Sequence, residues 1–91
     1  RFTAISSGDH TFYAIDEVGQ LWGWGWLDIP VEYPVPLVSH FETIPEGFAD
    51  EYFTQIDQLV PEAFAVTDEG NVWYLPPTGP IPIPFTPMHT Q

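Results

Sequence analysis

An internal repeat constrains the fold of this chain more than any other feature of its sequence. Residues 2–24 (FTAISSGDHTFYAIDEVGQLWGW) align without a gap with residues 53–75 (FTQIDQLVPEAFAVTDEGNVWYL). Identical residues at equivalent positions include Phe2 and Phe53, Gly19 and Gly70, and Trp22 and Trp73. A period of about 50 residues that is built from short strand-like segments is typical of propeller blades and related all-β arrays.

Each copy of the repeat predicts a β-hairpin. The runs FYAID and FAVT are short and rich in aromatic and β-branched residues, and the runs QLWGW and NVWYL follow them after a turn. The turns read DEVG and TDEG, in which an acidic residue accepts backbone hydrogen bonds and the closing glycine adopts a positive φ. We therefore expect hairpins over 11–24 and 62–75, with Gly19 and Gly70 in the left-handed region.

Two proline-spaced segments fit only the edges of a sheet. These are PVEYPVPLV at 30–38 and PIPIPF at 80–85, and proline has no N–H to donate to a central ladder. The segment 45–60 has room for one or two helical turns, but the repeat register assigns 53–56 to a strand. The sequence thus predicts an all-β chain of two propeller-blade-like antiparallel units, too few to close a propeller alone. We expect a single small domain over 1–91, with repeats at about 1–51 and 52–91.

The charge balance excludes several classes of partner. The 91 residues include 13 Asp and Glu but one cation, Arg1, and the formal net charge is -12. Binding to a phosphate backbone or an acidic membrane surface needs Lys and Arg, so we expect no nucleic acid and no membrane partner. We also expect mutual repulsion to raise the pKa values of several carboxyls, so that mild acid or salt stabilises the chain. The absence of cysteine leaves the compartment undetermined.

The first copy resembles a known repeat family. Its segment 5–25 is similar to the repeat of the regulator of chromosome condensation family, I-x-x-G-x-x-H-T-x-A-L-x-x-x-G-x-L-W-x-W-G. The matching residues are Ile5, Gly8, His10, Thr11, Ala14, Ile15, Gly19, Leu21, Trp22, Trp24 and Gly25, followed by the proline-valine segment 34–38. The second copy is more divergent and keeps Ile56, Gly70 and Trp73. The resemblance implies blades of a β-propeller that acts as a protein-binding platform, with His10 as a structural histidine.

The segment LWGWGWLD places three tryptophans at alternate positions. On a strand, Trp22 and Trp24 share one face, while Gly23 and Gly25 leave the other face open to a neighbouring backbone or ring. The repeat pairs these tryptophans with Trp73 and Leu75. We therefore expect Trp22, Trp24 and Trp73 to pack in the core.

Trp26 has no such requirement, because it aligns with Pro77 beyond the shared strand. An exposed Trp26, together with Tyr33 and Tyr74, would provide a stacking platform for a carbohydrate. A Trp26 buried under the proline segment would indicate a structural role instead.

Cofactor and catalytic patterns are weak. His40 and His89 are expected in exposed loops, and the histidines lack the spacing of metal ligands. Paired acids at equivalent turns, Asp16 with Glu17 and Asp68 with Glu69, keep calcium open as an alternative to no cofactor, although EF-hand spacing is absent. The chain has no cysteine or lysine, and no nucleophile motif surrounds its serines, so we predict no catalytic residues and no enzyme.

These observations favour a non-enzymatic protein-interaction or structural module of a larger assembly. Units of this kind cannot bury their faces alone, so we expect partners among other protein chains, as a homo-oligomer or a larger assembly such as a virion. The candidate interaction residues are Trp26, Tyr33, Tyr74, Pro34, Pro36 and Pro82. A carbohydrate-binding module that uses exposed aromatics is the alternative.

Overall fold

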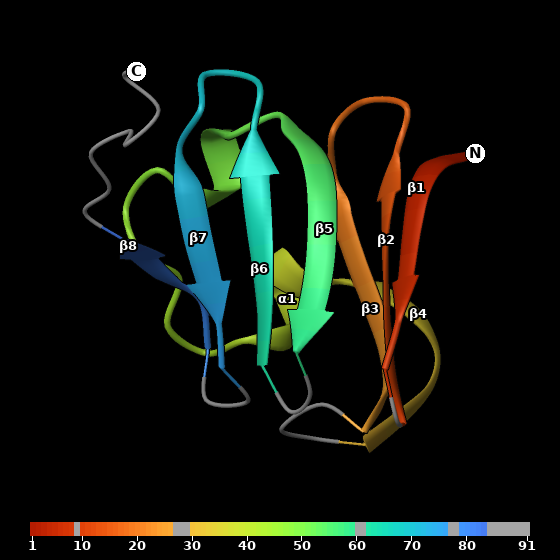
Figure 1. The fold of residues 1–91 in the computed structure, drawn as a ribbon. Coiled ribbons are helices and arrows are strands. Elements are labelled where there is room, and N and C mark those ends of the chain that lie inside the picture. Colours follow the sequence, from red (N-terminus) through yellow and green to blue (C-terminus); the bar gives the residue numbers. More distant parts are fainter. Residues whose placement is uncertain (9, 27–29, 60–61, 77–78, 84–91) are drawn as a thin grey trace.

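Two four-stranded antiparallel sheets make up the fold, and neither closes into a barrel (Figure 1). The structure is a computed structural model that describes residues 1–8, 10–26, 30–59, 62–76 and 79–83. The first sheet contains, in chain order, β1 (Phe2–Ser7), β2 (Thr11–Asp16), β3 (Leu21–Trp26) and β4 (Pro30–Pro36). The second sheet contains β5 (Phe53–Leu59), β6 (Glu62–Thr67), β7 (Val72–Leu75) and β8 (Ile81–Ile83). The prediction of an all-β chain with two antiparallel units is confirmed.

The repeat is visible in the strand pairing as well as in the sequence. The β1–β2 register shifts between Phe2 and Ala4, and the β5–β6 register shifts at the equivalent place, between Phe53 and Gln55. The residue inside each bulge is a threonine. The Thr3 hydroxyl donates to the carbonyl of Ile15, and the Thr54 hydroxyl donates to that of Val66, both over 3.2 Å. Identical local sequence thus produces identical local geometry in both sheets.

Both predicted hairpins form, and their turns adopt the expected geometry. Gly19 and Gly70 have φ angles of 80° and 85°, and each donates its N–H to the carbonyl three residues earlier. Asp16 in the first turn and Thr67 in the second each accept the backbone N–H groups two and four residues later. Different side chains therefore close the two turns in the same way.

The proline-rich strands β4 and β8 are the last strands of their sheets, as predicted. β4 ends at Pro36, and a four-residue helix, α1 (Leu37–His40), replaces the extended backbone expected at 37 and 38. Its first turn carries the chain away from the sheet edge and inserts Leu37 into the core. A 3-10 turn, η1 (Phe48–Asp50), lies in the window that had room for one or two turns. Residues 84 and 85 of the second proline segment lie outside the described residues.

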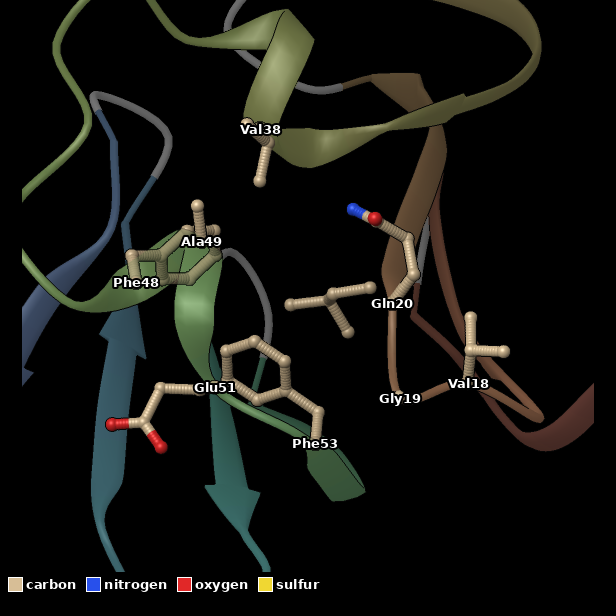
Figure 2. Close-up of a pocket in the computed structure, with 9 residues that line it drawn as sticks. Val18, Gly19, Gln20, Val38, Phe48, Ala49, Glu51 and Phe53 are labelled. Atoms are coloured by element: carbon tan, nitrogen blue, oxygen red, sulfur yellow. The ribbon is translucent and has the colours of Figure 1, made fainter.

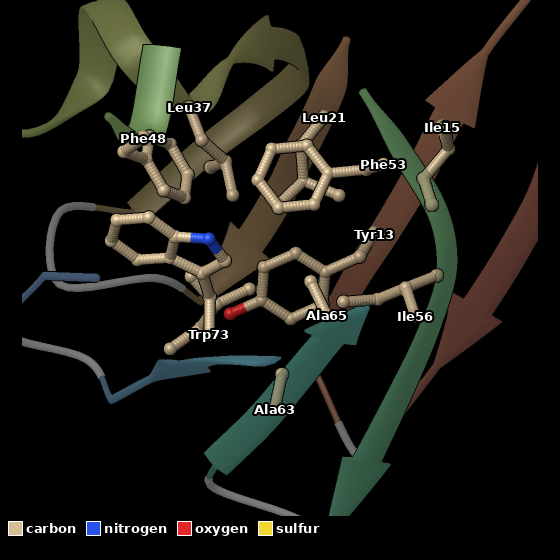
Figure 3. Close-up of a cluster of buried hydrophobic side chains, with 11 residues drawn as sticks. Tyr13, Ile15, Leu21, Leu37, Phe48, Phe53, Ile56, Ala63, Ala65 and Trp73 are labelled. Carbon is tan, nitrogen blue, oxygen red and sulfur yellow. The ribbon is translucent and has the colours of Figure 1, made fainter. Parts of the chain in front are cut away.

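One core lies between the two sheets and beneath the connecting segment (Figure 3). The first sheet contributes Tyr13, Ile15 and Leu21, and the connection contributes Leu37 and Phe48. The second sheet contributes Phe53, Ile56, Ala63, Ala65, Trp73 and Leu75. Phe48 packs edge-on against the Trp73 ring, with centroids 5.1 Å apart, so the connection closes the top of the core. Burial raises the pKa of the Tyr13 phenol to about 12.

Candidate interaction surfaces

Each sheet has two apolar faces, because its middle strands carry apolar side chains at nearly every position. We call one side of each sheet the tryptophan face. It carries Phe12, Ala14, Trp22 and Trp24 in the first sheet, and the equivalent Ala63, Ala65, Trp73 and Leu75 in the second. We call the other side the reverse face. It carries Tyr13, Ile15, Leu21 and Gly23 in the first sheet, and Phe64, Val66, Val72 and Tyr74 in the second.

Inside the molecule, the tryptophan face of the second sheet packs on the reverse face of the first. Trp73 is only 3% exposed, and it approaches the ring of Tyr13 from the opposite sheet (Figure 3). Hydrogen bonds reinforce the contact at both ends. The Gln58 amide donates to the carbonyl of Thr11 over 3.2 Å, and the Phe53 N–H donates to the carbonyl of Gly19 over 3.1 Å. Two unlike faces therefore form the internal interface.

The first outward surface is the tryptophan face of the first sheet. Phe12 and Trp24 stack with ring centroids 5.5 Å apart, and Phe2 contacts the rings of both Trp22 and Trp24. Trp22 and Trp24 are half-buried and lie outside the core, so the expectation of core packing is correct for Trp73 but wrong for these two residues. The reason is positional: the second sheet covers only the reverse face of the first.

Asp16 lies at the rim of this surface and is fully hydrogen-bonded. One carboxylate oxygen accepts the N–H groups of Val18 and Gln20 over 3.0 and 2.9 Å, and the other accepts Trp22 Nε1 over 2.9 Å. Partial desolvation by itself would raise the pKa of Asp16, but the hydrogen bonds from Trp22, Gln20 and Val18 outweigh it, so the pKa is lowered. The expectation of a raised pKa is therefore wrong at Asp16.

The second outward surface is the reverse face of the second sheet. Phe64 and Tyr74 stack there with centroids 5.3 Å apart, and the Tyr74 hydroxyl donates to a Glu62 carboxylate oxygen over 2.8 Å. That hydrogen bond raises the pKa of Tyr74. Phe12 and Phe64 were not predicted as interaction residues from the sequence. A feature of the sequence could have identified them: apolar residues stand at adjacent rather than alternate strand positions. Such a run indicates a strand that is covered on both faces.

The remaining interaction candidates lie near the outer edges of the sheets. Trp26, at the end of β3, is 63% exposed, and Tyr33 on β4 is 67% exposed. Tyr74 lies on the reverse face of the second sheet, opposite to the face that packs on the first sheet, so it does not share a platform with these two residues. The prolines singled out earlier lie on the edge strands: Pro34 and Pro82 are exposed and Pro36 is half-buried.

The repeat positions named earlier fall in two environments. Ile56 is buried between the sheets, whereas Ile5 is exposed on the tryptophan face of the first sheet. His10 precedes β2, and its carbonyl accepts the Trp26 N–H over 2.7 Å. The backbone of Gly25 approaches that carbonyl so closely that a Cβ would overlap it, which is the close approach expected of this glycine.

The other histidines and the acidic turns do not assemble into a site. His40 is half-buried in α1 and packs edge-on against Phe41, so its expected exposure is wrong. The helix α1, which replaces the expected extended backbone, turns the His40 side chain inward. His89 lies outside the described residues. Within the described ranges, no three His, Cys, Asp or Glu side chains lie close enough to hold a metal ion. No helix in that part of the chain is long and apolar enough to span a membrane.

Among the described residues, two of the hollows that lie beside the sheets are small. One, of about 80 Å³, lies between the β2–β3 turn and the connecting segment, where Gln20, Val38, Phe48 and Phe53 surround it (Figure 2). The other, of about 210 Å³, lies against β7 and β8 and is lined by Trp73, Asn71, Glu46 and Glu51, among others. Small-molecule sites usually have about 300 Å³ or more. Neither of these two hollows has the volume of a typical small-molecule site.

Comparisons with known proteins agree with the fold. No protein-family model matches the chain, and no curated protein matches it. Among solved structures, the crystal structure of human WBSCR16 is similar, with a TM-score of 0.69 and 18% sequence identity. The match covers 91% of this chain and 24% of that protein, so the chain spans about a quarter of its length. At this level of identity, the likeness shows a shared fold.

Proposed function

We propose that the chain is a non-enzymatic interaction module of a larger assembly, built from two repeats of the regulator of chromosome condensation type. Its partners are other protein chains, which cover the two outward sheet faces. A structural component of a large particle such as a virion is one concrete version of this role.

The observation that carries the proposal is the aromatic surface left on both outward faces. Phe2, Trp22 and Trp24 form a contiguous ring cluster on one side, and Phe64 and Tyr74 form another on the opposite side. Phe2 is 38% exposed and the other four rings are half-buried, so both faces leave apolar surface outside the core. Contiguous apolar surface of this kind marks interaction sites in proteins. Repeat units normally need neighbours on both sides to bury such faces.

The test is whether the isolated chain behaves as an incomplete unit. We expect the monomer at low concentration to bind an apolar fluorescent dye such as anilinonaphthalene sulfonate, and to unfold at low urea. Replacing Trp24 by Gln should reduce dye binding, because it removes the ring that contacts both Phe2 and Phe12. A monomer that unfolds cooperatively at high urea and binds no dye would contradict the proposed function.

Carbohydrate binding is a second candidate, and the exposure of Trp26 favours it. The Trp26 indole is 63% exposed, and the Tyr33 phenol on the neighbouring strand is 67% exposed. An exposed indole can stack on a sugar ring without a cationic residue. Glycan-array binding that is lost in Trp26→Ala but retained in Trp24→Gln would support this candidate. Binding that persists in Trp26→Ala would exclude it.

A further inference from the structure

The internal interface indicates how the outward faces are covered. Within the chain, a tryptophan face packs on a reverse face, and the two faces belong to equivalent sheets. The remaining pair of uncovered surfaces consists of one face of each kind, on opposite sides of the molecule. We infer that a second copy of this chain docks head to tail. The tryptophan face of its first sheet then lies on the reverse face of the first copy's second sheet. This inference rests on the proposed function and names its partner.

Equivalent positions with different exposure give the strongest support. Ile56 on the tryptophan face of the second sheet is only 9% exposed, because the first sheet covers it. Its repeat equivalent Ile5 occupies the same face of the first sheet and is 66% exposed. The same residue type at the same place in the repeat is therefore buried where a neighbouring sheet exists and exposed where none does.

The receiving surface can be located in the same way. Ile15 is fully buried on the reverse face of the first sheet, beneath the second sheet. Its equivalent Val66 is half-buried on the reverse face of the second sheet, beside Phe64 and Val72. Docking would therefore bring Ile5 of one copy against the surface around Val66 of the next.

Two residue differences between the repeats make the spacing between copies larger than the spacing between the two sheets of one copy. Phe12 occupies the position of Ala63, and Tyr74 occupies the position of Gly23. Both replacements add a ring to the outward faces, so neighbouring copies sit farther apart than the two sheets within one copy. Asp16 tolerates coverage at the rim, because its oxygens already accept three hydrogen bonds.

Charge limits the strength of this association. Each copy has a formal net charge of -12, and Glu62 and Asp57 lie on the receiving side. Repulsion between copies falls as salt screens it, so monovalent salt should strengthen the association. A head-to-tail contact of this type produces rings or open chains rather than a closed pair.

The test uses two variants, each with one charged substitution on one of the two faces, and then an equimolar mixture of the two variants. Sedimentation velocity should show that the wild type associates with increasing concentration and salt, whereas Ile5→Glu and Val66→Glu are each monomeric. Each substitution blocks one of the two unlike faces, so the equimolar mixture should recover a one-to-one dimer and nothing larger. The control is Val18→Glu on the β2–β3 turn, where Val18 is 69% exposed and belongs to neither face, and it should associate like the wild type.

Circular dichroism checks that the variants fold. If Val66→Glu loses strand signal, the isosteric Val66→Thr takes its place, and its dissociation constant should rise roughly tenfold because an unpaired hydroxyl is buried. A wild type that stays monomeric, a loss of association on one face only, or a mixture that forms no dimer would overturn the inference. A wild type that stays monomeric even at high concentration and salt, yet still binds the apolar dye, would overturn head-to-tail docking and leave the proposed function standing.

Discussion

Alanine substitutions at the two turn glycines should destabilise the chain by very different amounts. Both glycines have positive φ angles, so an alanine at either position costs about 1 kcal/mol in left-handed strain. At Gly70, no atom lies within 4 Å of an added Cβ, so strain is the whole cost. At Gly19, the added Cβ would lie 2.6 Å from two ring carbons of Tyr52 and 3.0 Å from its Cα.

The overlap at Gly19 also disturbs the contact between the sheets. The Tyr52 hydroxyl donates to the carbonyl of Glu17 over 3.0 Å, and the next residue, Phe53, donates its N–H to Gly19. Overpacking typically costs about 1–3 kcal/mol, and a lost hydrogen bond about 1 kcal/mol. We therefore expect strain, overpacking and one lost hydrogen bond together to make Gly19→Ala lower the free energy of unfolding by roughly 3–5 kcal/mol, against about 1 kcal/mol for Gly70→Ala.

Urea denaturation at one fixed, low protein concentration measures both values without a contribution from association. A fixed level of sucrose in every sample stabilises the folded state, so that the weakest variant still has a folded baseline. The Tyr52→Ala background provides the control, because without the ring most of the excess cost at position 19 should disappear. Equal destabilisation by the two alanines, or an excess that persists in Tyr52→Ala, would refute the packing argument.

Three further outcomes follow from the titratable groups and the net charge. Asp16→Asn should lower the free energy of unfolding by about 1 kcal/mol at pH 7. Because the native pKa of Asp16 is lowered, this difference from wild type should shrink as pH falls below the ordinary value of 3.8. Urea midpoints measured across that pH range test it. In a spectrophotometric titration, one tyrosine should ionise only near pH 12, and this late ionisation should be missing from the Tyr13→Phe variant. The free energy of unfolding should fall as pH rises from 10.0 toward 12, because the unfolded state loses this proton first. Monovalent salt should raise the thermal midpoint at pH 7, since 13 acidic residues face one cation; a midpoint indifferent to salt would show that repulsion between carboxylates is negligible.

The local elements could be read from the sequence because short-range physics specifies them. Short runs rich in aromatic and β-branched residues, joined by turns that end in glycine, predicted both hairpins. The missing N–H of proline predicted that β4 and β8 would be edge strands. The repeat predicted two equivalent sheets, and the bulges at Thr3 and Thr54 show that equivalence at the level of single hydrogen bonds. The helix α1 escaped prediction because it forms only where the chain leaves one sheet for the other.

Only the tertiary structure decided which of the two apolar faces of each sheet is buried. Trp22 and Trp73 are the same residue at the same repeat position, and the sequence therefore predicted the same burial for both. The structure buries Trp73 and leaves Trp22 half-exposed, because burial depends on what covers a face. The contact between the sheets joins two unlike faces, so the two sheets together leave one face of each kind on the outside.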